Sequence, residues 1–294
     1  MLFMGILLVK SGLLTVSESK SLSVVSLYLI TPCVILSSFQ IESTPEVRQG
    51  LLLALLAAVI VHIVLILSVR LLTPVLHLSR VEQVTVIYSN AGSLIIPIIA
   101  SIMGPDWVAY TSPFIAVQLF LIWSHAKMVL SGSSGIELEK VLKNINMVFI
   151  FIGIILFFSG IRFPAIVMDA VRSVGDMIGP LTMIVTGLLV GSMSWKKALA
   201  YRRVWLITFL RLVFFPLVIL SILKYSGLSH LAPDGRRILL VTLLAAITPS
   251  SGGLTQMAMI YCNPEDSEYA SVINVVTTLL CIITMPMIVA VYQI

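Results

Sequence analysis

Residues 89–97 read SNAGSLIIP and residues 247–253 read ITPSSGG, each inside a long apolar stretch. In hydrocarbon every backbone N–H and C=O needs a partner, so clustered Gly, Ser and Pro are tolerated mainly where the backbone is buried in protein or faces water. Each cluster therefore predicts a membrane helix that is interrupted, with unpaired backbone groups at the break. Two such breaks at matching places indicate a binding site near the middle of the bilayer.

The composition supports a membrane protein. Of the 294 residues 59% are hydrophobic and only 11% are charged, and the mean hydropathy is +1.10. Because a soluble domain carries about a quarter charged residues, this composition excludes an ordinary water-soluble fold. The apolar blocks are about 20 residues long, enough for a helix to cross a bilayer core, and they lack the alternation of a membrane barrel. They lie at about 21–40, 50–72, 83–103, 106–130, 146–160, 166–193, 204–224, 236–261 and 268–292.

A shorter apolar stretch, residues 1–9, precedes Lys10. Nine helical residues span only about 14 Å, roughly half of the hydrocarbon core. We therefore expect either that the first helix is a short element or that the functional product begins upstream of Met1. The start shows no cleavable secretion signal, so we expect the apolar segments themselves to direct the chain to the membrane.

The chain reads as two similar halves separated by the polar stretch SGSSGIELEKVLKN. Pro32 and Pro180 lie in matching apolar stretches, as do Pro97 and Pro249, and both pairs are about 150 residues apart. Since a unit of five helices is odd, its second copy must insert upside down. The predicted fold is an all-α polytopic membrane protein of about ten transmembrane helices, comprising a five-helix repeat (1–130), a cytoplasmic linker (131–144) and an inverted five-helix repeat (145–294).

Basic residues in the loops predict the topology, because cytoplasmic loops carry an excess of Lys and Arg. The odd-numbered loops hold eleven basic residues and the even-numbered loops hold six. This places the 131–144 linker in the cytoplasm and both termini outside the cytoplasmic membrane. The net charge of +5 is scattered over short loops without a continuous patch, so no nucleic-acid partner is expected.

Several stretches carry a family resemblance, and together they extend over nearly the whole chain. The sequence resembles the auxin efflux carrier family, which includes plant auxin exporters and bacterial malate and malonate carriers. The resemblance implies two inverted five-helix repeats, with the fourth and ninth helices broken and crossing at their prolines. It also implies a scaffold and a moving transport unit with elevator-type alternating access. The matching stretches are GILLVKSGLL (5–14), LYLITPCVILSSF (27–39), SNAGSLIIPII (89–99), VGDMIGPLTMIVTGLLVG (174–191), TPSSGGLTQMAMIY (248–261) and EYASVINVVTTLLCIITMP (268–286).

The resemblance implies a set of site residues. Asn90 stands seven residues before Pro97, as the substrate-contacting Asn stands before the crossing proline in auxin carriers. Gln118 falls near a position that lines the site, and Pro249 matches the second crossing proline. The stretch around Pro249 is richer in Ser and Gly than the plant pattern, which weakens the match there. The candidate substrate-binding residues are Asn90, Gly92, Ser93, Gln118, Thr248, Ser250 and Ser251, and the helix-crossing residues are Pro97 and Pro249.

Two ionisable residues lie deep inside apolar stretches, where charge is expensive. In a functional interpretation Arg211 attracts an anion electrostatically and His62 responds to protons. In the alternative, Arg211 reaches back to the cytoplasmic interface and His62 is a hydrogen-bonded packing residue. The sequence leaves both interpretations open.

The leading functional hypothesis is a secondary carrier of a small carboxylate, such as malate, malonate or an auxin-like weak acid, and not an enzyme. No GxxxxGK[ST] motif occurs, so an ATP-driven pump would need another subunit. Two alternatives are a non-transporting membrane sensor and an intramembrane hydrolase that uses Ser250 or Ser251 with His62 as base. The three cysteines are not spaced as metal ligands, so no metal or cofactor is expected. The expected partners are the organic anion and the lipid bilayer, and a homodimer is left open.

Overall fold

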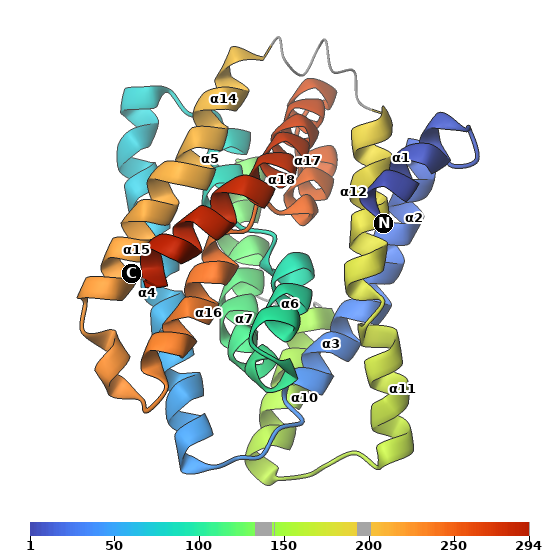
Figure 1. Ribbon diagram of the computed structural model, residues 1–294. Helices are drawn as coiled ribbons and strands as arrows, with labels where there is room; N and C mark the ends of the chain where they lie inside the picture. Colours follow the sequence, from blue (N-terminus) through green and yellow to red (C-terminus); the bar gives the residue numbers. More distant parts are fainter. Residues whose placement is uncertain (133–142, 144, 193–200, 294) are drawn as a thin grey trace.

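The computed structural model describes residues 1–132, 143, 145–192 and 201–293, and this part of the chain is helical apart from turns and one isolated bridge. The all-helical prediction is therefore confirmed for the described residues. Most of the predicted 131–144 linker, and the loop with Lys196 and Lys197, lie outside them. Figure 1 shows the chain as a bundle of steeply inclined helices.

The helices of the first half follow the predicted apolar stretches and extend past most of them. Two polar caps explain where α4 and α5 begin: the Thr44 hydroxyl accepts a hydrogen bond from Val47 N at 3.3 Å, and Ser79 and Glu82 form a capping box. The elements are α1 (Leu2–Lys10), α2 (Val16–Val25), η1 (Ser26–Ile30), α3 (Thr31–Ser38), α4 (Pro45–Leu76), α5 (Arg80–Ile87), α6 (Ala91–Ile102), η2 (Pro105–Thr111), α7 (Ser112–Leu121), η3 (Ile122–Ala126) and α8 (Lys127–Ser131).

The described part of the second half is also helical. Its elements are α10 (Ile145–Ser159), α11 (Ala165–Gly175), α12 (Ile178–Ser192), α14 (Arg202–Phe209), η4 (Leu210–Phe214), α15 (Phe215–Tyr225), η5 (Leu228–Leu231), α16 (Gly235–Ile247), α17 (Gly252–Tyr261) and α18 (Pro264–Gln293). Within the described residues, five helical runs are long and apolar enough to cross a membrane: Pro45–Leu76, Trp107–Ser131, Ala165–Ser192, Arg202–Tyr225 and Pro264–Gln293. The inverted arrangement of two five-helix units remains a prediction.

The helices gather into two bodies, each of which takes helices from both halves of the sequence. The small body comprises α1, α2, η1, α3, α10, α11 and α12, where α1 and α2 pack on α12, and α3 packs on α10 and α11. The large body comprises α4 to α8 and α14 to α18, and its continuous hydrophobic core draws only on residues 53–130 and 201–292. In Figure 1 the labelled helices of the small body lie mainly on the right, and α4, α14, α15 and α16 lie on the left.

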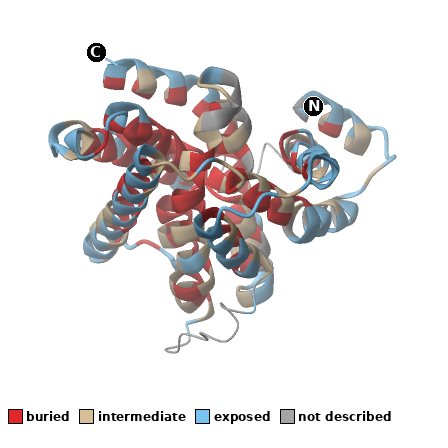
Figure 2. Cartoon of the chain, turned by 90° about the horizontal axis from the view of Figure 1, so that it is seen from below, coloured by how far each residue is buried: buried red, intermediate tan, exposed pale blue. Residues whose placement is uncertain are grey.

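Among the described residues, two small apolar clusters join the bodies. One groups Ile35 of α3 and Phe39 at its C-terminal end with Met147, Ile150 and Phe157 of α10, and it packs against α4 and α7 of the large body. The other includes Ile30, Val34 and Ile178 and packs against α6. Figure 2 shows exposed positions on the outward faces of the helices, many of them large apolar residues. Such outward apolar faces are suited to contact with lipid.

A buried carboxylate fastens one end of the large body. Glu82 at the start of α5 is 1% exposed, and Arg203 of α14 donates to both of its oxygens at 2.7 and 2.8 Å. The Tyr269 hydroxyl of α18 donates to Glu82 Oε1 at 2.8 Å. Arg203 also donates to the carbonyls of Leu76 and His77 at the end of α4. The ends of four helices are thus held together through the Glu82–Arg203 pair.

Candidate functional site

Two interrupted helices meet inside the large body. α5 ends at Ile87 and α6 begins at Ala91, while α16 ends at Ile247 and α17 begins at Gly252. The breaks exchange backbone hydrogen bonds, from Asn90 N to the Pro249 carbonyl at 2.8 Å and from Ser251 N to the Tyr88 carbonyl at 3.2 Å. Together they form the antiparallel bridge between Ser89 and Ser250. We call residues 88–90 and 248–251 the crossing.

The proline of the second break lies in the crossing itself, whereas the proline of the first break lies further along the helix. Pro249 lies in the crossing, where it cannot donate an N–H and disfavours helical geometry at Thr248, which is extended. We expected the helices to cross at both prolines, but Pro97 lies inside α6, seven residues past Asn90. The role of Pro97 in the crossing therefore stays a prediction. The first break instead forms where other side chains bind the backbone.

Gln118 of α7 binds the first break. Its Oε1 accepts hydrogen bonds from Ser89 N at 3.1 Å and Ser89 Oγ at 2.7 Å, and its Nε2 donates to the Ser89 carbonyl at 2.8 Å. Gln118 is 4% exposed. Its amide thus replaces the helical partners that the Ser89 backbone lacks. These contacts make Gln118 a residue that positions the crossing, whereas the sequence suggested direct substrate contact.

Asn274 of α18 binds the second break in a matching way, and the sequence did not reveal it. Its Nδ2 donates to the Ser250 carbonyl at 2.6 Å, and the Thr277 hydroxyl accepts from Ser250 N at 3.2 Å. Asn274 follows Gln118 by 156 residues, close to the 148 and 152 residues that separate the matched prolines, and that offset is the signal that could have found it. A long helix next to each break thus supplies a buried amide to the serine backbone at the crossing.

We expect Gln118→Leu and Asn274→Leu each to lower the thermal unfolding midpoint of the purified protein. Each change leaves buried backbone groups of Ser89 or Ser250 without partners, which costs about 1–3 kcal/mol. Gln83→Leu is the matched control, because Gln83 also donates to a backbone carbonyl, that of Leu78, but is only partly buried. A midpoint that falls no further than in Gln83→Leu would show that the amides do not hold the breaks.

The N-terminal ends of α6 and α17 begin at the crossing without side-chain caps. Neither Asn90 nor Ser251, their N-cap residues, caps the helix with its side chain, and among the described residues no partner appears for the Asn90 amide. A Cβ added at Gly92 would meet nothing within 4 Å, and one at Gly252 would meet only Asn274 Nδ2 at 3.9 Å. Space is therefore left beside both helix ends. Helix N-termini present N–H groups and partial positive charge, which suits an anion.

The other predicted residues divide between structural and open positions. Thr248 and Ser250 are fully buried; the Thr248 hydroxyl donates to the Ala245 carbonyl, and Ser250 Oγ has no partner among the described residues. Ser251 is 8% exposed at the start of α17. Ser93 belongs to the first turn of α6, but its side chain, like that of Pro97, lies outside the described structure.

His62 of α4 is buried as a packing residue. Its Nδ1 lies 2.7 Å from the Ala58 carbonyl and must donate to it, since a carbonyl can only accept. Its ring centroid lies 4.7 Å from that of Phe114, and Nε2 has no partner within the described chain. No described hydrogen bond joins His62 to Ser250 or Ser251, as the hydrolase hypothesis would need. Nearby, the Tyr88 hydroxyl is hydrogen-bonded to His125 Nδ1 at 2.8 Å.

Arg211 lies next to the crossing, at the C-terminal ends of α5 and α16. It is 0% exposed, so the interpretation that it reaches the membrane interface is wrong. Its Nη1 donates to the Val86 carbonyl at 3.0 Å, and its Nη2 donates to the carbonyls of Ala246 and Thr248, both at 2.7 Å. The guanidinium thus binds the C-terminal ends of α5 and α16.

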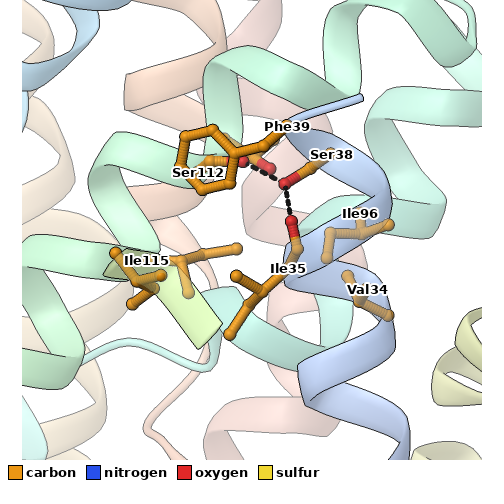
Figure 3. A pocket seen from close by; sticks show the side chains of 9 residues that line it. Val34, Ile35, Ser38, Phe39, Ile96, Ser112 and Ile115 are labelled. Atoms are coloured by element: carbon orange, nitrogen blue, oxygen red, sulfur yellow. Dashed lines mark hydrogen bonds between the residues drawn. The ribbon is translucent and has the colours of Figure 1, made fainter. Parts of the chain in front are cut away.

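Two cavities lie where the bodies meet. A void of about 10 Å³, room for one water molecule, lies between α3, α6, η2, α7 and α10. Figure 3 shows Ser112 Oγ donating to Ser38 Oγ across it, at 2.6 Å, with Ser38 donating to the Ile35 carbonyl. A larger cleft of about 470 Å³ is lined by Gln40, Ile41, Glu42, Thr44, Val47, Trp107, Tyr110, Arg172 and Asp234. It separates α11 of the small body from η2 and the start of α16.

A multi-pass helical protein whose two interrupted helices meet at buried, polar breaks has the architecture of a membrane transporter. The comparison with protein families agrees. The family model described as membrane transport protein matches residues 1–140 and 133–289. The chain therefore belongs to this family, that of the auxin efflux carriers, and is a multi-pass membrane transporter. Among curated protein sequences none matches the chain.

Proposed function

We propose that the protein is a secondary carrier of small organic anions that carry a carboxylate. The observation that supports this most strongly is the pair of uncapped helix N-termini, those of α6 and α17, that begin at one crossing. Their partial positive charges favour a carboxylate without a fixed countercharge that would trap it. The Asn90 amide adds a neutral donor at the same place.

We further propose that the anion is moved by elevator-type alternating access, with the large body sliding against the small one. Three observations support relative motion. The main core is confined to the large body, the clusters that join the bodies are small, and the cleft beside Arg172 and Asp234 separates them at one end. The crossing would travel with the large body, because Gln118, Asn274 and Arg211 all belong to it.

The function is tested on purified protein with a panel of mono- and dicarboxylates that includes malonate and malate. A ligand that binds only the folded state raises the unfolding midpoint. Uptake of the same acids into proteoliposomes then separates a carrier from a sensor, which would bind but not accumulate them. Absence of both binding and uptake across the panel would overturn the proposal.

We propose that both termini lie outside the cytoplasmic membrane, from the distribution of basic residues. In a cysteine-free background, Ser43→Cys in the loop before α4 should react with an impermeant thiol reagent in intact cells. Ser11→Cys, in the loop after α1, should react only after the cells are permeabilised. The reverse pattern would show that the chain is inserted the other way round.

A further inference from the structure

Arg211 makes contacts that in many carriers are made by an ion. Its three acceptors, the carbonyls of Val86, Ala246 and Thr248, lie at the C-terminal ends of α5 and α16. Carbonyls in a last helical turn lack partners within the helix, and each helix end carries about half a negative charge. In carriers with interrupted helices such ends coordinate the coupling Na⁺ or H⁺. Here two ends share one buried guanidinium.

The charges at the crossing balance in a simple way. Two C-terminal helix ends contribute about one negative charge, and Arg211 contributes one positive charge that is 0% exposed. The N-terminal ends of α6 and α17 begin at the same crossing and remain positive. Without a cation behind the crossing, the two pairs of helix ends would nearly cancel, and the crossing would have little preference for an anion.

We propose that Arg211 is the resident cation of the crossing, so that anion binding depends on its charge and needs no inorganic cation. The part that concerns anion binding rests on the proposed function. The part that concerns the carbonyls does not, because it follows from the three hydrogen bonds alone. Arg211 is a positioning residue in this proposal, since it acts through the helix ends.

The first experiment uses no organic anion. Thermal unfolding midpoints are measured for the parent protein, Arg211→Ala, Arg211→Lys and Arg211→Gln in choline chloride, in NaCl and in dilute guanidinium chloride at one ionic strength. Arg236→Ala is the matched control, because Arg236 also donates to terminal carbonyls, those of Tyr292 and Gln293, but it is exposed and lies at the end of α18.

The parent and Arg236→Ala should have the same midpoint in choline as in NaCl. Arg211→Ala should be less stable in choline and should recover at least in part when Na⁺ or guanidinium enters the vacated space. Arg211→Lys should be more stable than the neutral Arg211→Gln. The proposal would be overturned if neither Na⁺ nor guanidinium raised the unfolding midpoint of Arg211→Ala by more than it raised the midpoints of the parent and Arg236→Ala. If Arg211→Ala does not fold, equal losses in Arg211→Lys and Arg211→Gln would overturn it as well.

The second experiment measures malonate binding by the parent, Arg211→Lys and Arg211→Gln in sodium-free buffer. The parent should bind without Na⁺, Arg211→Lys should retain most of the affinity, and Arg211→Gln should bind at least about tenfold more weakly. A parent that requires Na⁺, or an Arg211→Gln variant with parental affinity, would overturn the proposal. If the parent binds no carboxylate, the proposed function fails, while the midpoints in the three salts still decide the role of Arg211.

Discussion

Asn90→Ala should weaken binding of the transported acid about ten- to a hundredfold and reduce its initial uptake rate. The change removes a neutral hydrogen-bond donor at the N-terminus of α6. The Asn90 side chain is partly buried there, and its amide has no hydrogen-bond partner among the described residues. A hydrogen bond to a charged group is worth about 1.5–3 kcal/mol, which corresponds to that loss of affinity. The measurement compares affinity and initial uptake for one acid in monodisperse preparations.

The matched control is Asn263→Ala. Asn263 also precedes a helix, α18, where its Oδ1 accepts a hydrogen bond from Asp266 N at 2.7 Å, but it lies away from the crossing. The Asn263→Ala variant should be less stable than the parent but should bind the transported acid with the same affinity. If Asn90→Ala binds and transports the acid like the parent, the substrate site is elsewhere, and the role that the family resemblance implies for Asn90 does not hold.

A covalent link between the two bodies should stop transport completely. In a cysteine-free background, Arg172→Cys on α11 and Asp234→Cys before α16 place one thiol on each side of the cleft of about 470 Å³. Bifunctional methanethiosulfonates of increasing length, which form reducible disulfides with both thiols, then bridge it. Because elevator transport requires the bodies to slide, uptake should fall to background and should return after reduction, while binding of the acid from the open side persists.

A link within one body should leave transport intact. Gln40→Cys with Phe163→Cys provides it, since Gln40, two residues past α3, accepts a hydrogen bond through Oε1 from Phe163 N, two residues before α11, at 2.9 Å. Full uptake by the Arg172–Asp234 protein when it is quantitatively cross-linked would rule out sliding between these surfaces. Equal inhibition by both links would mean that cross-linking itself, and not the lost motion, is the cause.

Much of the fold was predictable because a bilayer restricts the choices. Apolar stretches of about 20 residues must be helices, and clustered Gly, Ser and Pro must interrupt them, so both breaks could be placed from residues such as Asn90 and Pro249. The family resemblance placed the crossing at Pro97 as well, whereas the first break lies at residues 88–90. A proline weakens a helix near itself, but the break forms where a partner binds the freed backbone, and Gln118 provides that partner at Ser89.

The contacts of the candidate site were less predictable, because they join residues far apart in the chain. Asn274 is one of several polar residues on α18, and its spacing from Gln118 could single it out but could not show that it reaches Ser250. From the sequence, only the position of Arg211 deep in an apolar stretch could help to decide whether it attracts an anion or reaches back to the cytoplasmic interface. Its actual partners are carbonyls of α5 and α16, which side-chain identity cannot reveal.

The crossing also constrains how the chain is inserted during synthesis. Gln118 is separated from Ser89 by 29 residues, whereas Arg211 reaches Val86 across 125 residues. While the second half is still on the ribosome, the first break can bind the Gln118 amide but neither the backbone around Pro249 nor the Arg211 guanidinium. The C-terminal end of α5 would then be unpaired in lipid, which is costly. We therefore expect α5 and α6 to stay near the translocon or water until the stretches that contain Arg211 and Pro249 have been synthesised. Their final integration into the bilayer would then be late although their synthesis is early.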